Sequence, residues 1–474
     1  MLSKNIISCQ FLVHLLPLLL LLLSKHADSA GSIVETLPGY PGNLPFKLET
    51  GYIRVNESEL FYLFVESEGK PRQDPLMLYL NGGPGCSALT GFFFQTGPLS
   101  FNTTDYSGGL PTLLLYPHTW TKSASIIFVD EPVGTGFSYS QNSEDYYISD
   151  TGSAHQLHLF IRKWLKEYPK FINNPFFIAS DSYSGIIAPI VAQEIFDGNE
   201  GGMYPYINLL GIVSGSPHTD SKLEDNSKIP FACDMALISD SLYEAVKRDC
   251  NGNYIDVDVS NTACVEDLLA INKCVDDINN QDILLPKCDL ALPYSNDEQR
   301  RRSLREASRK LPIPNSKTQD YFCKNFEYIL SYIWANNETV QEALHVRKGT
   351  VKQWYRCNLT LAHETYIYSV ASAIDYQRNL TERSMKVLLY SGDHDMVVPH
   401  ISTEEWISTL KLTLDIDWRP WFVNGQVAGY TMKYSKNRYE LTYATLKGAG
   451  HSPTEYKGKE CYNMFERWIH RYPL

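Results

Sequence analysis

The chain has 474 residues, 43% of them hydrophobic, and carries a formal net charge of −12 at pH 7. This length can bury a large core and allows about three domains, although some α/β folds run longer as one. The acidic balance argues against a nucleic-acid-binding surface, because such surfaces are strongly basic. It fits a soluble protein, including one from an acidic compartment.

The first thirty residues have the pattern of a secretory signal peptide. Lys4 precedes an apolar run over 11–23, and cleavage is expected near Ala27 to Ala30. The alternative is a membrane anchor, but this run is shorter than the roughly 20 residues needed to span a bilayer. The mature chain is therefore expected in the secretory pathway, without a membrane span.

Cysteines and sequons agree with that pathway. Nine cysteines remain after the signal peptide, so at least one thiol is free, and their spacing leaves the connectivity open. They are Cys86, Cys233, Cys250, Cys264, Cys274, Cys288, Cys323, Cys357 and Cys461. Five N-x-Ser/Thr sequons predict glycosylation. They are at Asn56, Asn102, Asn337, Asn358 and Asn379.

The first part of the chain alternates strand and helix patterns. Antiparallel strands are predicted over 52–66. Apolar strands are predicted over 75–80, 125–129, 176–179 and 209–213, and a helix over about 151–167. Strands that alternate with helices favour a largely parallel sheet covered on both faces.

Between about 218 and 350 the pattern changes to helices and clustered cysteines, which we interpret as an insertion that caps the site. Residues 300–310 hold six basic side chains within the polar stretch 295–317. A solvated loop is the simpler interpretation of this stretch. The alternative is a linker whose excision leaves two chains tied by disulfides.

The sheet pattern then resumes, with strands over 385–390 and 440–446 and a closing helix over about 460–470. The predicted organisation is a signal peptide over 1–30, a first core part over 31–217, the cap over 218–350 and a second core part over 351–474.

Three reactive side chains follow the ends of predicted strands. Ser182 lies among small residues between a strand and a helix, which is typical of a nucleophile elbow. Asp395 and His451 follow the two later strands, at the edge where parallel sheets place their sites. Nucleophile, acid and base in this order are the chain order of an α/β-hydrolase. Asp393 in the same turn is the alternative acid.

These residue types suit acyl transfer through a covalent intermediate. The imidazole of His451 would take the proton of Ser182, and the carboxylate would orient the imidazole. The N–H groups of Tyr183 and Gly83 would stabilise the oxyanion. No metal or cofactor is expected: His155 and His158 share a helix face, but the sequence spaces no Cys or carboxylate near them.

Four motifs resemble the serine carboxypeptidase family: YLNGGPGCS (79–87), DEPVGTGFSY (130–139), SDSYSG (180–185) and GAGH (448–451). The resemblance covers nearly the whole mature chain. It implies an α/β-hydrolase fold, with a mostly parallel central sheet, helices on both faces and a helical, disulfide-bearing cap. It also implies Asp395 as the triad acid. The implied disulfides are Cys86 with Cys357, Cys250 with Cys264, and Cys288 with Cys323.

Within that family, carboxypeptidases hold the substrate carboxylate with an Asn and two Glu residues. Here Asn81 is present, but the Glu positions hold Asp181 and Gln95. This departure resembles the plant carboxypeptidase-like acyltransferases, which use 1-O-β-glucose esters as acyl donors, and residues 452–456 and 461–465 look like that subgroup too.

The resemblance therefore implies acyl transfer to an acceptor hydroxyl, with the glucose hydrogen-bonded by Asn81 and Asp181 and with Gln95 as a further substrate-binding residue. Arg356 either binds an acidic acceptor or is an ordinary surface residue. The alternative function is a serine-type carboxypeptidase acting at acid pH, and a third is a non-catalytic binding protein. A vacuolar location is implied, with secretion as the alternative.

Overall fold

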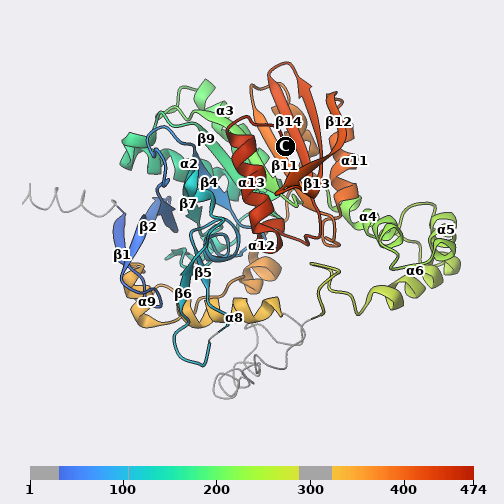
Figure 1. Ribbon diagram of the computed structural model, residues 1–474, viewed down its shortest axis with the longest axis horizontal. Helices are drawn as coiled ribbons and strands as arrows, with labels where there is room; N and C mark the ends of the chain where they lie inside the picture. Colours follow the sequence, from blue (N-terminus) through green and yellow to red (C-terminus); the bar gives the residue numbers. More distant parts are fainter. Residues whose placement is uncertain (1–30, 105, 288–322) are drawn as a thin grey trace, which may run out of the picture.

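The computed structural model describes residues 31–104, 106–287 and 323–474. The predicted signal peptide and the basic stretch 295–317 lie outside the described residues. In the described part, one large sheet forms the centre and helices cover both of its faces (Figure 1).

The strands lie in two stretches of the described chain, within 32–215 and 386–446. They are β1 (Ser32–Thr36), β2 (Asn43–Val55), β3 (Ser58–Val65), β4 (Leu76–Leu80), β5 (Leu99–Phe101), β6 (Leu113–Leu115), β7 (Ser125–Val129), β8 (Tyr139–Ser140), β9 (Phe176–Asp181), β10 (Leu209–Gly215), β11 (Lys386–Gly392), β12 (Thr413–Val423), β13 (Gln426–Lys436) and β14 (Tyr439–Leu446). Strands β5 and β6 form a separate hairpin.

The main sheet runs in the order β1-β2-β3-β7-β4-β9-β10-β11-β14-β13-β12, with β8 beside β3. From β7 to β14 every neighbouring pair is parallel. Antiparallel strands flank this centre on both sides. The prediction of a mostly parallel central sheet is confirmed by the strands from β7 to β14.

The helices follow the strands through the chain. The α-helices are α2 (Asp150–Glu167), α3 (Ser184–Glu200), α4 (Ser221–Asp234), α5 (Asp240–Asp249), α6 (Thr262–Val275), α8 (Lys324–Ala335), α9 (Glu338–Ala343), α10 (Ile374–Leu380), α11 (His400–Thr409), α12 (Pro453–Tyr456) and α13 (Gly458–Ile469). Short helical turns are η1 (Gly91–Gln95), η2 (Trp120–Lys122), η3 (Ser143–Tyr146), η4 (Pro169–Phe171) and η5 (Leu361–Thr365).

Two cores lie on opposite faces of the sheet. Along β4, Leu76, Leu78 and Leu80 pack with α2 and α3. The intervening Met77 and Tyr79 pack with α8 and α13. Successive strand side chains point to opposite faces, and both faces are buried. This explains why the central strands are continuous apolar runs in the sequence.

Helix α2 shows how local sequence sets an element. The Ser149 hydroxyl accepts the N–H of Gly152 at 3.1 Å and caps the first turn. Leu157, Phe160 and Trp164 recur at helical spacing and are buried against the sheet. The predicted helix over 151–167 is confirmed.

The segment expected to form a cap is helical in its described residues. Helices α4, α5 and α6 share a small apolar cluster that includes Phe231, Val246 and Ile271. Helix α8 packs on a main core instead, through Leu330 and Trp334. None of the described helices is long and apolar enough to cross a bilayer.

Two of the implied disulfides are formed, Cys86–Cys357 and Cys250–Cys264. Cys323 is also disulfide-bonded, and its implied partner Cys288 lies outside the described residues. Within the described part the free cysteines are Cys233, Cys274 and Cys461.

Candidate active site

Ser182 lies in the tight turn between β9 and α3. Its φ of 57° is in the left-handed region, which non-glycine residues seldom adopt. A Cβ on Gly82 would lie 2.7 Å from the Ser182 Cβ and 2.8 Å from the Tyr183 nitrogen. Residues 82–85 form a glycine-rich turn after β4, which we call the glycine turn. It therefore touches the turn that carries Ser182, and only glycine fits at position 82.

The structure brings Ser182, His451 and Asp395 into one chain of hydrogen bonds. Nε2 of His451 lies 2.7 Å from Oγ of Ser182, and Nδ1 lies 2.8 Å from Oδ2 of Asp395. Asp395 is fully buried, and its Oδ1 accepts the N–H groups of Val397 and Val398 at 2.8 and 3.0 Å. The carboxylate is therefore fixed, and it favours the tautomer that offers Nε2 to the hydroxyl.

The charges around His451 favour its protonated form. Burial alone would lower the pKa of His451, but the carboxylates of Asp395 and Asp181 raise it to about 9. An imidazole in this setting can take a proton from a hydroxyl and hold it near a leaving group.

Asp393, the alternative acid, has other partners. Its Oδ1 lies 2.6 Å from Nδ1 of His394 and accepts the N–H of Gly448 at 2.6 Å. It joins the turn after β11 to the turn after β14.

Of the two expected oxyanion donors, Tyr183 follows Ser182 in the chain, and Gly83 follows Gly82, where an added Cβ would touch Ser182. Within the described residues the N–H groups of Gly83 and Tyr183 donate to no other group. The Tyr183 phenol donates to Oδ1 of Asp150 at 2.6 Å, and its ring stacks on His218. These contacts fix the backbone that follows Ser182.

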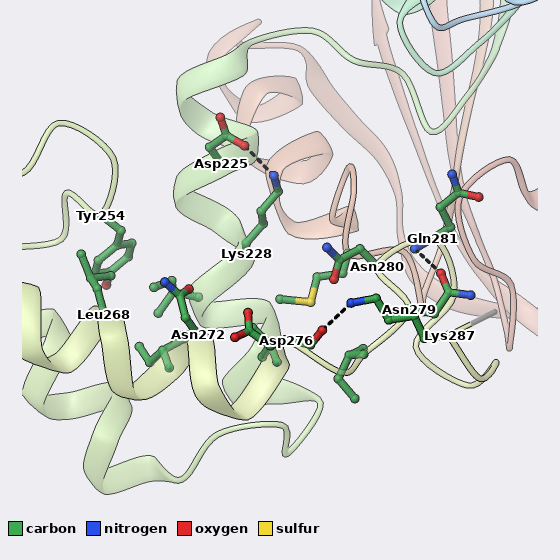
Figure 2. Close-up of a pocket in the computed structure, with 15 residues that line it drawn as sticks. Asp225, Lys228, Tyr254, Leu268, Asn272, Asp276, Asn279, Asn280, Gln281 and Lys287 are labelled. Atoms are coloured by element: carbon green, nitrogen blue, oxygen red, sulfur yellow. Dashed lines mark hydrogen bonds and ion pairs between the residues drawn. The ribbon is translucent and has the colours of Figure 1, made fainter. Parts of the chain in front are cut away.

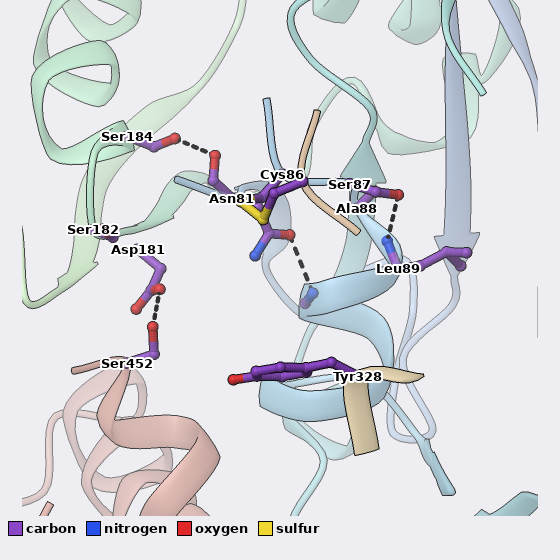
Figure 3. Close-up of a disulfide and its surroundings, with 12 residues drawn as sticks. Asn81, Cys86, Ser87, Ala88, Leu89, Asp181, Ser182, Ser184, Tyr328 and Ser452 are labelled. Atoms are coloured by element: carbon purple, nitrogen blue, oxygen red, sulfur yellow. Dashed lines mark hydrogen bonds between the residues drawn. A yellow bond between two sulfur atoms is a disulfide. The ribbon is translucent and has the colours of Figure 1, made fainter. Parts of the chain in front are cut away.

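Three residues expected to bind the acyl donor also lie together, and we call them the donor site. They are Asn81, Asp181 and Gln95. Gln95, at the end of η1, accepts the Asn81 amide N–H at 3.0 Å and donates from Nε2 to Oδ2 of Asp181 at 3.1 Å. Oδ1 of Asn81 accepts the N–H of Gly91 at 3.1 Å. Figure 3 shows Asn81, Asp181 and Ser182 near the Cys86 disulfide.

Asp181 is a buried acid with one unused oxygen. Burial raises its pKa to about 7, although His451 and the Ser452 hydroxyl favour the charged form. Oδ1 is buried and has no hydrogen-bond partner among the described residues, so a ligand reaches it only by entering between its neighbours. Below its pKa this group can donate to a ligand oxygen, and above its pKa it can accept from a ligand hydroxyl.

Sequence reasoning missed two residues of this network, Ser452 and Glu455. The Ser452 hydroxyl donates to Oδ2 of Asp181 (Figure 3). Oε1 of Glu455 accepts from Gln95 at 3.3 Å, and Oε2 accepts from the Tyr328 hydroxyl at 2.7 Å. The only sequence signal was their place in the segment 452–456 that resembles one subgroup of the family.

Arg356 is held near the glycine turn. Its guanidinium lies 3.9 Å from the centre of the Tyr328 ring, and its backbone oxygen accepts the N–H of Ser87 at 2.7 Å. The next residue, Cys357, is bonded to Cys86. Within the described residues no carboxylate pairs with this guanidinium, so its charge is available to a ligand.

One helix pair carries side chains with metal-ligand spacing. No carboxylate lies at metal-ligand spacing from His155 and His158 in the sequence. The fold nevertheless brings Glu194 close, and its Oε2 lies 3.1 Å from Nδ1 of each histidine. Nε of Arg162 donates to Nε2 of His158 at 2.5 Å. Nδ1 of His158 therefore carries a proton toward Glu194. The cluster fits a hydrogen-bonded contact between α2 and α3 better than a metal site.

A cavity of about 640 Å³ lies between α4, α6 and the segment 276–287 (Figure 2). The backbone oxygens of Asn280 and Gln281, at its wall, accept the N–H groups of Met396 at 3.0 Å and His451 at 2.5 Å. The cap segment therefore supports the loops that carry Asp395 and His451.

The chain is similar in sequence to serine carboxypeptidases and serine carboxypeptidase-like proteins. A profile described as serine carboxypeptidase matches residues 38–471. Serine carboxypeptidase-like 13 and serine carboxypeptidase-like 10 of Arabidopsis thaliana are 44% and 45% identical over 466 residues, which cover 98% of this chain and 99% of each relative.

Among solved structures, Kex1, a prohormone-processing carboxypeptidase of Saccharomyces cerevisiae, has a TM-score of 0.70 at 18% identity. The match covers 93% of this chain and 95% of that chain, and it shows a shared fold. With its parallel sheet and Ser182 between β9 and α3, the chain has an α/β-hydrolase fold and belongs to the serine carboxypeptidase family.

Proposed function

We propose that the protein is an acyltransferase that moves an acyl group from a 1-O-β-glucose ester to an acceptor hydroxyl. The observation that carries this proposal is the joined set of Asn81, Gln95 and Asp181 beside Ser182, in which one of the two carboxyl positions is an amide. The chain is also similar to plant proteins described as serine carboxypeptidase-like, a description that fits this subgroup.

In the first half-reaction, Ser182 attacks the ester carbonyl while Nε2 of His451 takes its proton, over the 2.7 Å hydrogen bond between them. His451 then gives this proton to the departing glucose oxygen. The N–H groups of Gly83 and Tyr183 stabilise the oxyanion, and loss of one such donor costs about 3 to 4 kcal/mol in comparable enzymes. Asp395 orients the imidazole and stabilises the imidazolium.

In the second half-reaction, His451 takes a proton from the acceptor hydroxyl, whose oxygen attacks the acyl-enzyme. The bond between the acyl carbon and Oγ of Ser182 then breaks, and His451 returns the proton to Oγ. Transfer exceeds hydrolysis when the site holds the acceptor and excludes water. Arg356, with its unpaired charge fixed on the Tyr328 ring, would hold an acidic acceptor.

The donor site suits sugar hydroxyls. Gln95 cannot titrate, so positions 95 and 181 cannot share a proton in the way that two carboxyl groups do. A sugar hydroxyl both donates and accepts, so it can bind the unused Oδ1 of Asp181 in either protonation state.

The second candidate is an acid carboxypeptidase. It is favoured by the pKa of Asp181, which burial raises to about 7. At pH 5 a neutral Asp181 could donate a hydrogen bond to a substrate's terminal carboxylate.

One experiment separates these functions. The purified protein and its Ser182→Ala variant are incubated at pH 5 to 6 with acyl-glucoses plus acidic or neutral hydroxyl acceptors, and separately with N-blocked dipeptides. Ester products that vanish in Ser182→Ala support acyl transfer. Trimmed dipeptides support the carboxypeptidase, and no product in either assay leaves a non-catalytic binding protein.

We also propose the secretory pathway as the location, with the vacuole favoured over secretion, and the two disulfides fit an oxidising compartment. Among the sequons, Asn56 and Asn379 are exposed. Nδ2 of Asn358 instead donates to the Gly134 oxygen at 2.9 Å. Glycans are therefore expected first at Asn56 and Asn379.

A further inference from the structure

A second carboxylate lies one side chain away from Asp181. The side chain of Glu455 on α12 is 4% exposed, and its Oε1 lies 3.3 Å from Nε2 of Gln95. The same Nε2 donates to Oδ2 of Asp181 at 3.1 Å. The Gln95 amide therefore bridges two buried carboxyl groups that are far apart in the sequence.

Four hydrogen bonds determine which way the Gln95 amide points. Oε1 accepts from the Tyr79 hydroxyl at 2.7 Å and from Nδ2 of Asn81 at 3.0 Å. Nε2 uses its two hydrogens for Asp181 and Glu455. A carboxylate can only accept, so Glu455 holds Nε2, rather than Oε1, toward Asp181.

Glu455 is itself anchored from the other side. Its Oε2 accepts from the Tyr328 hydroxyl at 2.7 Å and lies 3.8 Å from Nζ of Lys324. Tyr328 is the ring on which Arg356 stacks. The Glu455 carboxylate thus links the donor-site residues to Tyr328, the ring that holds Arg356, the residue expected to bind the acceptor.

We propose that Glu455 is a specificity-determining residue of the donor site, which holds Gln95 so that Asp181 presents its unshared oxygen to a sugar hydroxyl. A carboxylate at this position also opposes an anionic ligand at the same place. This inference rests on the proposed function, because it assigns the ligand class of that site.

Electrostatic repulsion explains why Glu455 would disfavour an anionic ligand in the donor site. Charges in a buried site are weakly screened, so a carboxylate ligand beside Glu455 meets repulsion that a neutral hydroxyl does not. Lys324 offsets part of this charge, but it lies on the side of Glu455 away from Gln95. Neutralising Glu455 should therefore weaken glucoside binding and improve carboxylate binding.

The test uses hydrolysis of p-nitrophenyl acetate, which requires no glucose ester. Inhibition constants are measured for phenyl β-glucoside and for N-acetylphenylalanine with the intact protein, Glu455→Gln and the control Glu460→Gln. In Glu455→Gln we expect the glucoside constant to rise about 10-fold, as for one lost hydrogen bond to a charged group. We expect the carboxylate constant to fall, and the control to leave both unchanged.

Parallel changes in the two constants, or none, would overturn the role of Glu455. If Glu455→Gln does not fold, the Tyr328→Phe variant decides. It keeps the Glu455 carboxylate and removes the hydrogen bond from the Tyr328 hydroxyl to Oε2 of Glu455. A smaller rise in the glucoside constant, about 3-fold, supports the role, and no rise overturns it. If the constants shift but the intact protein transfers no acyl group from glucose esters, the proposed reaction fails while the assignment of Glu455 stands.

Discussion

The hydroxyl of Ser452 donates a hydrogen bond to Oδ2 of Asp181. The residue after the expected base is thereby bonded to the residue before the expected nucleophile. Strands β9 and β14 are separated by β10 and β11 in the sheet, so this bond joins two loops that the sheet alone does not bring into contact. The protonation of Asp181 is therefore coupled to the surroundings of His451.

This coupling predicts the effect of Asp181→Asn on the pH dependence of the reaction. The Asp181 carboxylate helps to raise the pKa of His451 to about 9. Because the base must be neutral to take a proton, removal of this charge should move the acid limb of kcat/KM to lower pH. Hydrolysis of p-nitrophenyl acetate at pH 4 to 9 measures it. An unmoved limb, or one moved to higher pH, contradicts the coupling.

Glu131 predicts how stability depends on pH. Burial and the nearby Asp150 raise the pKa of Glu131 to about 8 in the folded chain. Between about pH 4 and 8 the folded state keeps a proton that the unfolded state releases, so stability falls as pH rises. Glu131→Gln should therefore add about 4 kcal/mol at pH 8 and little at pH 4. Thermal unfolding measures this, with the exposed Glu144→Gln as the control.

Other buried groups act in the same direction. Burial raises the pKa of Asp130 to about 6 and that of Glu404 to about 7. The raised pKa of His451 stabilises the fold below its ordinary value near 6.5, and this contribution is lost as pH rises through about 9. The intact protein should melt at a higher temperature at pH 5 than at pH 8, and the reverse order would show that other groups dominate.

Gly82→Ala tests the contact between Gly82 and Ser182, the expected nucleophile. The added Cβ would lie 2.7 Å from the Ser182 Cβ, so one of the two turns must move. We expect kcat for p-nitrophenyl acetate to fall at least about 100-fold, since small misplacements of reacting groups are costly. Gly201→Ala, at the exposed end of α3, serves as the control. Full activity in Gly82→Ala would show that the turn adapts.

The Cys86–Cys357 disulfide joins residues 271 positions apart. Cys357→Ser should lower stability by about 3 to 5 kcal/mol, because loss of a long-range crosslink frees the unfolded chain. Arg356 is the preceding residue, so the KM for an acidic acceptor should rise as well. Denaturant unfolding and acceptor kinetics on the same samples measure both, and an unchanged midpoint would contradict the stabilising role.

Arg356→Leu tests the acceptor site. It removes the unpaired guanidinium while keeping an apolar contact to the Tyr328 ring. The KM for an acidic acceptor should rise about 10-fold or more, as for a lost charged hydrogen bond, and that for a neutral acceptor should not change. The exposed Lys352→Leu is the charge-matched control. Equal losses for both acceptors would leave Arg356 as a structural residue.

Much of the centre of the fold was predictable because its strands are buried on both faces and end in turn residues. The sequence did not predict the outer strands β12 and β13. Leu414, Ile416 and Trp418 alternate with Asp415 and Asp417, but they lie on an exposed outer strand. Such a strand lacks the continuous apolar run that marked the buried ones.

Part of the candidate site could be predicted from the sequence and part could not. Ser182 and His451 follow strand ends and could be placed by pattern. Glu455 could not, because its contact with Gln95 spans 360 positions and depends on how α12 packs against η1. Nothing in the local sequence of α12 encodes that packing.

The pairing of β10 with β11 joins residues from the two sides of the stretch 295–317. Excision there would leave Ser182 on one polypeptide and Asp395 with His451 on the other. The junction would run through the middle of the parallel sheet, where each polypeptide supplies a strand that the other needs. The mature form would then be a heterodimer held together along the pairing of β10 with β11.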